Sequence, residues 1–313
     1  MTDHFLTIDS LGREGLRQVL DMAHRFKRTQ GQSRKALDGG RIGMIFDKPS
    51  TRTRVSFEAA AWALGMLPTT LRPDELQLGH GETIADTARV LSRYLSALVI
   101  RTFEQAKVEE LAANSTIPVI NALTDDHHPC QALADVMTLE ETYDDLRTVR
   151  VAFIGDGNNV CHSLIQTAGL AGFTLVIATP EGYRPNPQIV EAGRRNCAAN
   201  GGDIIVLDDP VEAVAGADAV YTDVWASMGK EAEREERARI FAGYTVNDAL
   251  MEHAAPHAIF LHCLPAHRGS EVTDEVMDGF YSRVWDQAEN RLYTEQAVLY
   301  SLISGDRRGE RLG

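Results

Sequence analysis

The sequence predicts an α/β fold with two doubly wound parallel-sheet domains. Apolar segments of strand length alternate with segments of helical period along the chain, and this order is typical of parallel sheets covered by helices. A polar stretch at residues 140–150 interrupts the alternation, which then starts again. At 313 residues the chain is also long enough for two separate cores.

The first domain is expected to comprise residues 1–140 together with 286–313. It opens with a helix at 14–28, where apolar residues recur at helical spacing. Strands followed by helices are then predicted at 41–46 with 53–64, 97–100 with 105–113, and 119–123 with 130–140. A final helix at 286–304 carries an apolar face and is expected to return to this domain.

The second domain is expected to comprise residues 141–285. Its predicted strands are separated by helical segments or by segments rich in Gly and Pro, and they lie at 151–154, 174–178, 203–206, 219–221 and 258–262. This pattern predicts a second doubly wound sheet.

Charge and composition exclude several classes of partner. The chain has 31 Lys and Arg against 45 Asp and Glu, a net charge of −14, which repels nucleic acid and anionic membranes. No apolar run approaches the ~20 residues of a membrane helix, and the N-terminal residues lack the pattern of an export signal. The four cysteines are far apart, which argues against a zinc ribbon or a disulfide framework. We therefore expect a cytoplasmic protein whose anionic ligands need a local basic pocket.

The loop Ser50-Thr51-Arg52-Thr53-Arg54 follows the first predicted strand and begins a helix. Hydroxyls, guanidinium groups and the N–H groups of a helix N-terminus all favour phosphate. The alternative is that Ser50 or Thr51 only caps the helix while the arginines face solvent. Because two arginines in the first turn oppose the helix dipole unless an anion binds there, we favour phosphate binding.

A second polar loop, His127-His128-Pro129-Cys130-Gln131, follows the predicted strand at 119–123. Its imidazole and amide groups are expected to face the same sheet edge as the arginine loop. The alternatives are a buried structural histidine or a metal cluster. Zinc would need further ligands, which only His262, Cys263 and His267 offer, so no metal is predicted.

The segment Gly155–Val160 follows the first strand of the second domain and is similar to a dinucleotide-binding loop. Val160 stands where that pattern requires Gly or Ala, and no acidic residue follows the next strand near Ala178. A nicotinamide-dependent enzyme is therefore only the runner-up class. Asn159, which can donate and accept, suits the amino and carboxylate groups of an amino acid.

The segment His262–Gly269 follows the last predicted strand. A catalytic pair of His262 and Cys263 is not favoured, because neighbouring strand residues point to opposite faces of a sheet. Cys263 is therefore not expected to act as a covalent nucleophile.

Together these segments resemble the aspartate/ornithine carbamoyltransferase family. STRTR with the following SFE, RTF after a strand, HPCQALAD and HCLPAHRG stand in the order and spacing of that family over nearly the whole chain. STRTR and HP-x-Q resemble the carbamoyl phosphate half that all members share. The segment Asp223–Gly229 (DVWASMG), GDGNN and HCLP resemble the members that act on ornithine.

The resemblance implies where carbamoyl phosphate binds. Its phosphate and carbonyl ends are expected at Ser50, Thr51, Arg52 and Thr53. Further contacts with this substrate are expected from Arg101, His128, Gln131, Cys263, the carbonyl of Leu264, and Arg291. Gln77 resembles a residue that reaches a neighbouring subunit's site, which implies a homotrimer or a multiple of trimers, although the segment before it departs from the family pattern at Arg72-Pro73.

The resemblance also implies where ornithine binds. Asp223 and Cys263 are expected at its δ-ammonium group, and its α-amino and α-carboxylate groups are expected at Asn159, Ser227 and Met228. The expected catalytic residues are Cys263, Arg101, His128 and Asp223. The active site is expected in the cleft between the two domains, which must close before reaction.

The implied reaction is carbamoyl transfer from carbamoyl phosphate to L-ornithine, in arginine biosynthesis. No cofactor is expected, because carbamoyl phosphate is already activated and the enzyme supplies positioning and charge stabilisation. The alternatives are transfer to putrescine, acylated ornithine or aspartate, a nucleotide-dependent oxidoreductase, and a catalytically silent binding protein.

Overall fold

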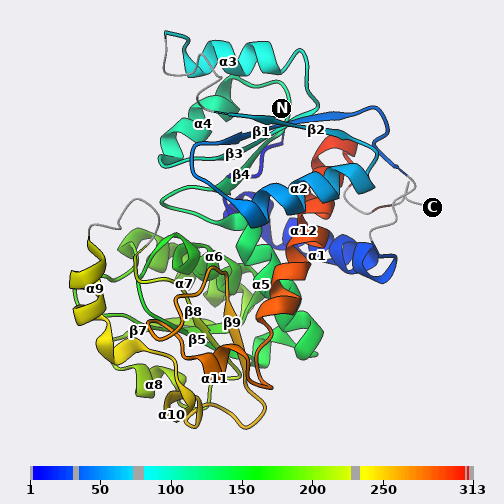
Figure 1. The fold of residues 1–313 in the computed structure, drawn as a ribbon. Helices are drawn as coiled ribbons and strands as arrows, with labels where there is room; N and C mark the ends of the chain where they lie inside the picture. Colours follow the sequence, from blue (N-terminus) through cyan, green and yellow to red (C-terminus); the bar gives the residue numbers. More distant parts are fainter. Residues whose placement is uncertain (1–2, 31–34, 73–80, 227–232, 307–308, 310–313) are drawn as a thin grey trace. The chain divides into compact units, whose positions relative to one another are not determined.

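The computed structural model describes residues 3–30, 35–72, 81–226, 233–306 and 309 (Figure 1). The chain divides into two compact units, Met1–Met137 with Glu289–Gly313, and Thr138–Ala288. The junctions lie three residues from those expected from the sequence, at 137 against 140 and at 288 against 285. Each unit contains one parallel sheet, which confirms the predicted α/β fold class.

Unit 1 has a four-stranded sheet in the order β2-β1-β3-β4. Its strands are β1 (Arg41–Phe46), β2 (Leu67–Leu71), β3 (Ala97–Arg101) and β4 (Val119–Leu123). Its helices are α1 (Gly12–Arg28), α2 (Thr51–Ala63), α3 (Ile84–Leu91), α4 (Gln105–Asn114), and most of α5 (Pro129–Thr142) and α12 (Val284–Ser304). A core on one side of the sheet joins Ile45 and Leu98 to apolar residues of α3 and α4.

Strand β2 was not predicted from the sequence. It is an edge strand that pairs only with β1, and its residues LPTTL include a proline and two threonines. None of its residues is fully buried, so it needs no apolar run of the kind that marks β1 and β3.

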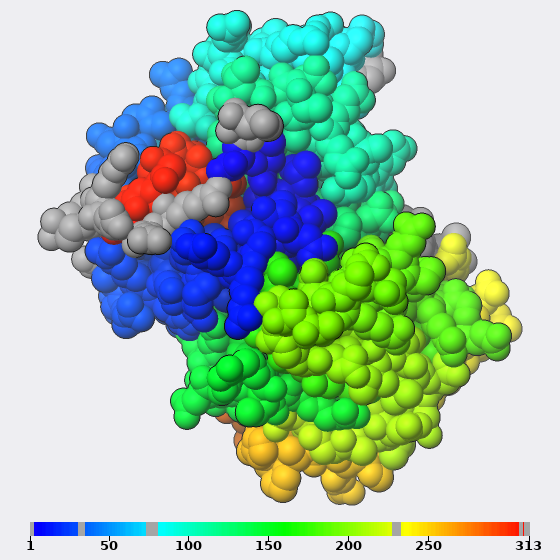
Figure 2. Space-filling model, turned by 180° about the vertical axis from the view of Figure 1, so that it is seen from behind, coloured from blue at the N-terminus to red at the C-terminus, as the bar shows by residue number. Residues whose placement is uncertain are grey.

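Helix α12 packs on α1 within unit 1. The rings of Phe26 and Tyr300 meet edge to face at 6.2 Å, and the Nζ atom of Lys27 donates to the Oδ1 atom of Asn290 at 2.7 Å. In the space-filling view the blue N-terminal residues and the red C-terminal part of α12 lie side by side (Figure 2). The prediction that the last helix returns to the first domain is therefore confirmed.

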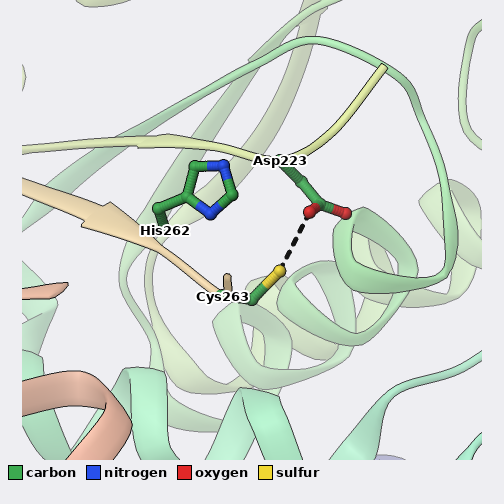
Figure 3. Close-up of side chains that lie close together, drawn as sticks. All are labelled: Asp223, His262 and Cys263. Carbon is green, nitrogen blue, oxygen red and sulfur yellow. Dashed lines mark hydrogen bonds between the residues drawn. The ribbon is translucent and has the colours of Figure 1, made fainter. Parts of the chain in front are cut away.

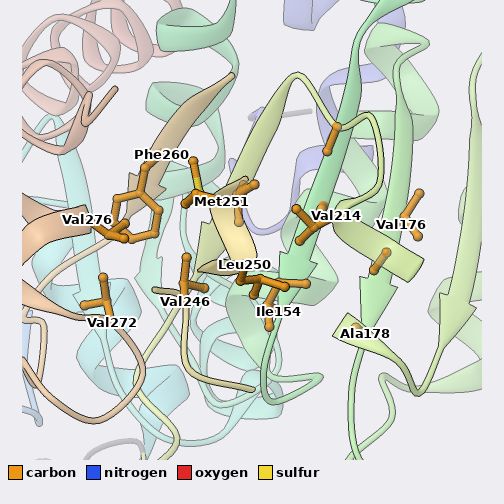
Figure 4. Packing of buried hydrophobic residues seen from close by; sticks show 14 of the residues in the cluster. Ile154, Val176, Ala178, Val214, Val246, Leu250, Met251, Phe260, Val272 and Val276 are labelled. Carbon is orange, nitrogen blue, oxygen red and sulfur yellow. The ribbon is translucent and has the colours of Figure 1, made fainter. Parts of the chain in front are cut away.

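Unit 2 has a five-stranded parallel sheet in the order β7-β6-β5-β8-β9. Its strands are β5 (Arg150–Ile154), β6 (Thr174–Ala178), β7 (Asp203–Leu207), β8 (Ala219–Thr222) and β9 (Ile259–His262). Its helices are α6 (Asn159–Ala171), α7 (Pro187–Asn200), α8 (Pro210–Val214), α9 (Arg234–Ile240), α10 (Asp248–Met251) and α11 (Asp274–Met277). Figure 4 shows Ile154, Val176 and Phe260 of this sheet packed with side chains from the helices and loops that cover it.

The strand order places the candidate ligand loops. In unit 2 the chain proceeds from β5 to one side of the sheet and returns to the other side at β8. In unit 1 it likewise moves from β1 to the edge strand β2 and then back to β3. In such sheets, ligands bind at the carboxyl ends of the two strands between which the strand order reverses, because the loops that follow these strands lead away from each other and leave a crevice. The loops after β1 and β3, and those after β5 and β8, are therefore the first places to look for a site.

No helix among the described residues has the length and apolar character that a membrane-spanning segment requires.

Candidate active site

The arginine loop of unit 1 begins α2, as the sequence predicts. Ser50 is the N-cap residue, but its side chain makes no capping hydrogen bond within the described part of the chain. Thr53 is buried, whereas Arg52 is exposed. Arg54 is also exposed, and its Nε atom donates to Glu58 one turn later at 3.0 Å. Both arginines are thus exposed, as in the alternative, although among the described residues Ser50 does not make the capping hydrogen bond that the alternative assumed.

A basic cluster forms around His128 in unit 1. Arg101 is the last residue of β3, and His128 directly precedes α5; both side chains are buried. Burial lowers the pKa of His128 well below its usual range, and the positive charges of Arg291, Arg101 and Arg52 lower it further. His128 is therefore neutral at pH 7, and three arginines make this region attractive to an anion.

Arg291 of α12 joins the other predicted residues of unit 1. Its Nη1 atom donates to the Oε1 atom of Gln131 at 2.9 Å, and its Nη2 atom donates to the Oγ1 atom of Thr53 at 3.2 Å. Helices α2, α5 and α12, which are far apart in the sequence, thus each contribute to one polar cluster. The structure brings together Thr53, Gln131 and Arg291 by direct contact, and Arg52, Arg101 and His128 by electrostatic interaction.

Two carboxylates in this cluster were not predicted from the sequence. Asp135 accepts from the Nε2 atom of Gln131 at 2.8 Å, and Glu295 accepts from the Nε atom of Arg291 at 3.0 Å. Both acids follow their partner by four residues on a helix, which is the spacing at which side chains meet. That spacing was the available signal, but it is equally common on exposed helix faces.

In unit 2, Asp223 and Cys263 meet beyond the ends of neighbouring strands. Asp223 follows β8 and Cys263 follows β9, and the Sγ atom of Cys263 donates to the Oδ1 atom of Asp223 at 2.9 Å (Figure 3). Asp223 is buried and Cys263 is partly exposed. The parallel register of β8 and β9, with Thr222 beside His262, explains why the next residues in each strand lie together.

Asn158 holds the second oxygen of Asp223. Its Nδ2 atom donates to the Oδ2 atom of Asp223 at 2.7 Å, while its Oδ1 atom accepts from the backbone N–H groups of Val160 and Cys161. One side chain therefore caps α6 and fixes the carboxylate. The sequence had pointed to Asn159, which begins α6 and is buried. Asn158, the preceding residue of GDGNN, was missed.

His262 lies beside this pair, contrary to expectation. One ring nitrogen of His262, the Sγ atom of Cys263 and a carboxylate oxygen of Asp223 all lie within 4.8 Å of one another. The expectation that His262 and Cys263 point to opposite faces is wrong here, because β9 ends at His262 and strand alternation ends with it.

The hydrogen bonds of His262 argue against two kinds of chemistry. Its Nδ1 atom accepts from the backbone N–H of Leu264 at 2.8 Å, and its Nε2 atom lies 3.3 Å from the Oε1 atom of Glu271. Because both nitrogens are engaged, a metal ion would have to displace one of these bonds, and neither nitrogen is placed to accept a proton from Cys263. The donor set therefore fits an amine-binding site better than a metal site or a thiol–imidazole pair.

Leu264 has a positive φ of 60°, and its peptide bond to Pro265 is cis. This turn lies directly after Cys263 and contains the Leu264 carbonyl, which the family resemblance predicts to contact carbamoyl phosphate.

Arg237 of α9 anchors the loop that begins at Asp223. Its Nη1 atom donates to the carbonyl oxygen of Trp225 and to the Oδ2 atom of Asp156, both at 2.7 Å. Trp225 stacks on Phe241 with ring centroids 5.8 Å apart. Arg237 thus ties the loop after β8 to the loop after β5. No motif marked this residue in the sequence.

Three predicted site residues, Gln77, Ser227 and Met228, lie outside the described residues.

Comparison with known proteins finds two domains of one family along the chain. Residues 3–141 match the aspartate/ornithine carbamoyltransferase carbamoyl-P binding domain, and residues 147–302 match the Asp/Orn binding domain of the same family. The "Ornithine carbamoyltransferase, anabolic" of Pyrococcus furiosus is 51% identical over 302 residues, which cover 96% of each chain. The ornithine carbamoyltransferase of Anoxybacillus flavithermus is 50% identical over 301 residues, 96% of each chain.

Solved structures show the same relationship. The ornithine carbamoyltransferase structure from Pyrococcus furiosus matches with a TM-score of 0.94 at 50% identity, covering 97% of this chain and 98% of that one. The anabolic enzyme from Campylobacter jejuni matches with a TM-score of 0.91 at 37% identity, covering 97% and 99%. The chain therefore belongs to the aspartate/ornithine carbamoyltransferase family.

Proposed function

We propose that this chain is an ornithine carbamoyltransferase, which converts carbamoyl phosphate and L-ornithine to L-citrulline and phosphate. The observation that carries the choice of ornithine is the buried carboxylate of Asp223, which Cys263 and Asn158 hold beyond the sheet edge of unit 2. The named relatives at about half identity support the same activity.

The basic cluster of unit 1 is assigned to carbamoyl phosphate. Ser50, Thr51, Arg52 and Thr53 offer hydroxyls, backbone N–H groups and one guanidinium at a helix N-terminus, which suits a phosphate group. Arg101, neutral His128 and Arg291 add donors for the carbonyl oxygen, and Gln131 and the Leu264 carbonyl suit the carbamoyl nitrogen. We also assign Cys263 to the binding of carbamoyl phosphate, and we assign Gln77 to the same substrate in a neighbouring subunit.

The transfer forms one bond and breaks one. The neutral δ-amine of ornithine attacks the carbonyl carbon, and negative charge develops on the carbonyl oxygen, where the arginines and His128 stabilise it. The C–O bond to phosphate then breaks, and phosphate leaves with the electron pair and accepts the proton that the amine releases. Arg291 is already held by hydrogen bonds to Thr53, Gln131 and Glu295, so this donor needs little reorganisation as the charge develops.

Asp223 selects the amine. A carboxylate attracts the δ-ammonium group of ornithine and repels the second carboxylate of aspartate. Together with Cys263 it is positioned to accept the ammonium group and help remove its proton. Asn159, Ser227 and Met228 are assigned to the α-amino and α-carboxylate end, which putrescine lacks.

We further propose that the protein is a cytoplasmic homotrimer, or a multiple of trimers, that serves arginine biosynthesis. The anabolic enzymes among its relatives support the biosynthetic role. All four cysteines are free thiols, which fits a reducing compartment. Light scattering would test the trimer.

The test of the function is a citrulline-release assay with carbamoyl phosphate and a panel of amines, run with and without NAD. We expect citrulline from ornithine alone, at a rate that NAD does not change. Equal rates with putrescine, acylated ornithine or aspartate would reassign the substrate. Turnover that requires NAD would reassign the class, and no turnover with any amine would indicate a binding protein.

A further inference from the structure

Glu295 forms a buried ion pair with Arg291, and the assigned chemistry uses Arg291 but gives Glu295 no role. They lie one turn apart on α12, and the Nε and Nη2 atoms of Arg291 donate to the same carboxylate oxygen, Oε1, at 3.0 and 2.5 Å. Glu295 is 1% exposed and Arg291 is 5% exposed. The pair of Arg17 and Asp21 on α1, which has the same spacing, is exposed to solvent. Because water screens a buried pair less than an exposed one, the attraction between Glu295 and Arg291 restricts their side chains more strongly.

The pair fixes the direction of the Arg291 guanidinium. A guanidinium has five N–H groups in a rigid plane. Four contacts, to Glu295 twice, Gln131 and Thr53, account for four of them among the described residues. Glu295 holds the Nε edge, so the Nη1 and Nη2 ends face Gln131 and Thr53. One N–H of Nη1 then remains for an incoming oxygen atom.

We propose that Glu295 is a positioning residue that fixes Arg291, and that it takes up a proton when a phosphate-bearing substrate binds beside the pair. This inference rests on the proposed function, because that function brings carbamoyl phosphate to Arg291.

The charges around Glu295 support the proton uptake. Burial raises the pKa of Glu295 to about 7, even though Arg291 acts to lower it. From α5 the pair faces Cys130, whose buried thiol has a raised pKa and stays neutral, and Asp135, whose charge acts on Arg291. Before α5, His128 is neutral because its pKa is lowered. Near pH 7, Glu295 is therefore poised between two charge states.

The sign of the linkage follows from Coulomb's law. A phosphate dianion beside Arg291 repels ionised Glu295, so the complex favours the protonated carboxyl. The protonated form must then bind the dianion more tightly. A rise of one pKa unit on binding corresponds to an affinity that falls by about tenfold as pH rises through the titration of Glu295.

Two variants separate positioning from charge. Glu295→Gln keeps an oxygen that can accept from Arg291 but has no charge to titrate, whereas Glu295→Ala removes the acceptor. Asp21→Asn, which neutralises the acid of the exposed pair with Arg17, is the matched control.

The experiment is titration calorimetry of the intact enzyme with carbamoyl phosphate in two buffers of different ionisation enthalpy, from pH 6 to 8.5, combined with steady-state kinetics. We expect the wild type and Asp21→Asn to take up more protons near pH 7 than Glu295→Gln. We also expect kcat/KM to fall in Glu295→Ala and to be largely restored in Glu295→Gln.

Equal proton uptake in the wild type and Glu295→Gln would overturn the proposed linkage. Equal kcat/KM in Glu295→Ala and the wild type would overturn the positioning role. If both variants failed to fold, a wild-type affinity that did not change with pH beyond the titration of carbamoyl phosphate itself would overturn the linkage. A wild type that bound no carbamoyl phosphate would instead contradict the proposed function.

Discussion

The Sγ atom of Cys263 donates to the Oδ1 atom of Asp223 at 2.9 Å. This hydrogen bond joins the residues that directly follow two adjacent parallel strands, β9 and β8. A carboxylate that is buried and already hydrogen-bonded keeps its position when a cation approaches. This arrangement underlies the first two predictions.

Asp223→Asn should lose kcat/KM for ornithine by about 100-fold or more, because the variant keeps the shape of the side chain but removes the charge that attracts the δ-ammonium group. Carbamoyl phosphate affinity, measured by calorimetry, should change little. Asp208→Asn, which alters an exposed ion pair with Arg184 in the same unit, is the control. An Asp223→Asn enzyme with normal ornithine kinetics would show that the amine site is assigned wrongly.

Cys263→Ser should retain activity within about tenfold of the wild type, because a serine hydroxyl can also donate to Asp223 and no covalent step requires sulfur. The measurement is citrulline release, accompanied by intact-mass spectrometry of the wild type during turnover. Detection of a carbamoyl or phosphoryl adduct on Cys263 would contradict the assigned role.

Arg52→Ala should weaken carbamoyl phosphate binding by about 100-fold, because it removes a charge-assisted phosphate contact. Folding should survive, since Arg52 is exposed. The matched control is Arg54→Ala, two residues later, whose guanidinium pairs with Glu58. Calorimetry should find a much smaller loss of affinity in the control. Similar losses of affinity in both variants would mean that the loop attracts carbamoyl phosphate through its total positive charge and not through a specific contact of Arg52.

Asn158→Ala should do two things at once. It removes the N-cap of α6, at a cost of about 1 kcal/mol in the free energy of unfolding, and it releases Asp223, which should raise KM for ornithine. Asn186→Ala removes the N-cap of α7 alone and should cost similar stability without the kinetic effect. Equal ornithine kinetics in the two variants would contradict a link between the cap and the site.

The lowered pKa of His128 should be visible in the pH dependence of the free energy of unfolding. Its pKa is lowered in the folded protein, so below about pH 6.5 the unfolded chain binds a proton that the folded protein does not. The protonation of His128 therefore does not affect the free energy of unfolding above pH 6.5, and it lowers that free energy as pH falls below this value. Thermal unfolding between pH 5 and 7.5 should show less loss at low pH in His128→Gln than in the wild type. His253→Gln, which changes an exposed histidine, should follow the wild type. Parallel curves for all three proteins would contradict the assignment.

The sequence by itself determined the fold class and most of the elements. Buried strands such as β1 and β3 were found because both faces of a central parallel strand are covered, which produces an uninterrupted apolar run. The loops after β1, β4, β5 and β9 were found because they follow such strands and carry polar groups at a helix start or strand end. The edge strand β2 escaped because none of its residues is fully buried.

Only the tertiary structure decided which polar residues contact one another. Arg291, Gln131 and Thr53 come from three helices, and no local sequence pattern predicts that their side chains meet. Glu295, Arg237 and Asn158 were missed for the same reason: each is an ordinary polar residue until packing places it against a specific partner. Burial also sets their chemistry, because the loss of water lowers the pKa of His128 and raises that of Glu295. Local sequence specifies which groups are present at a strand end, whereas long-range packing specifies their distances and their charge.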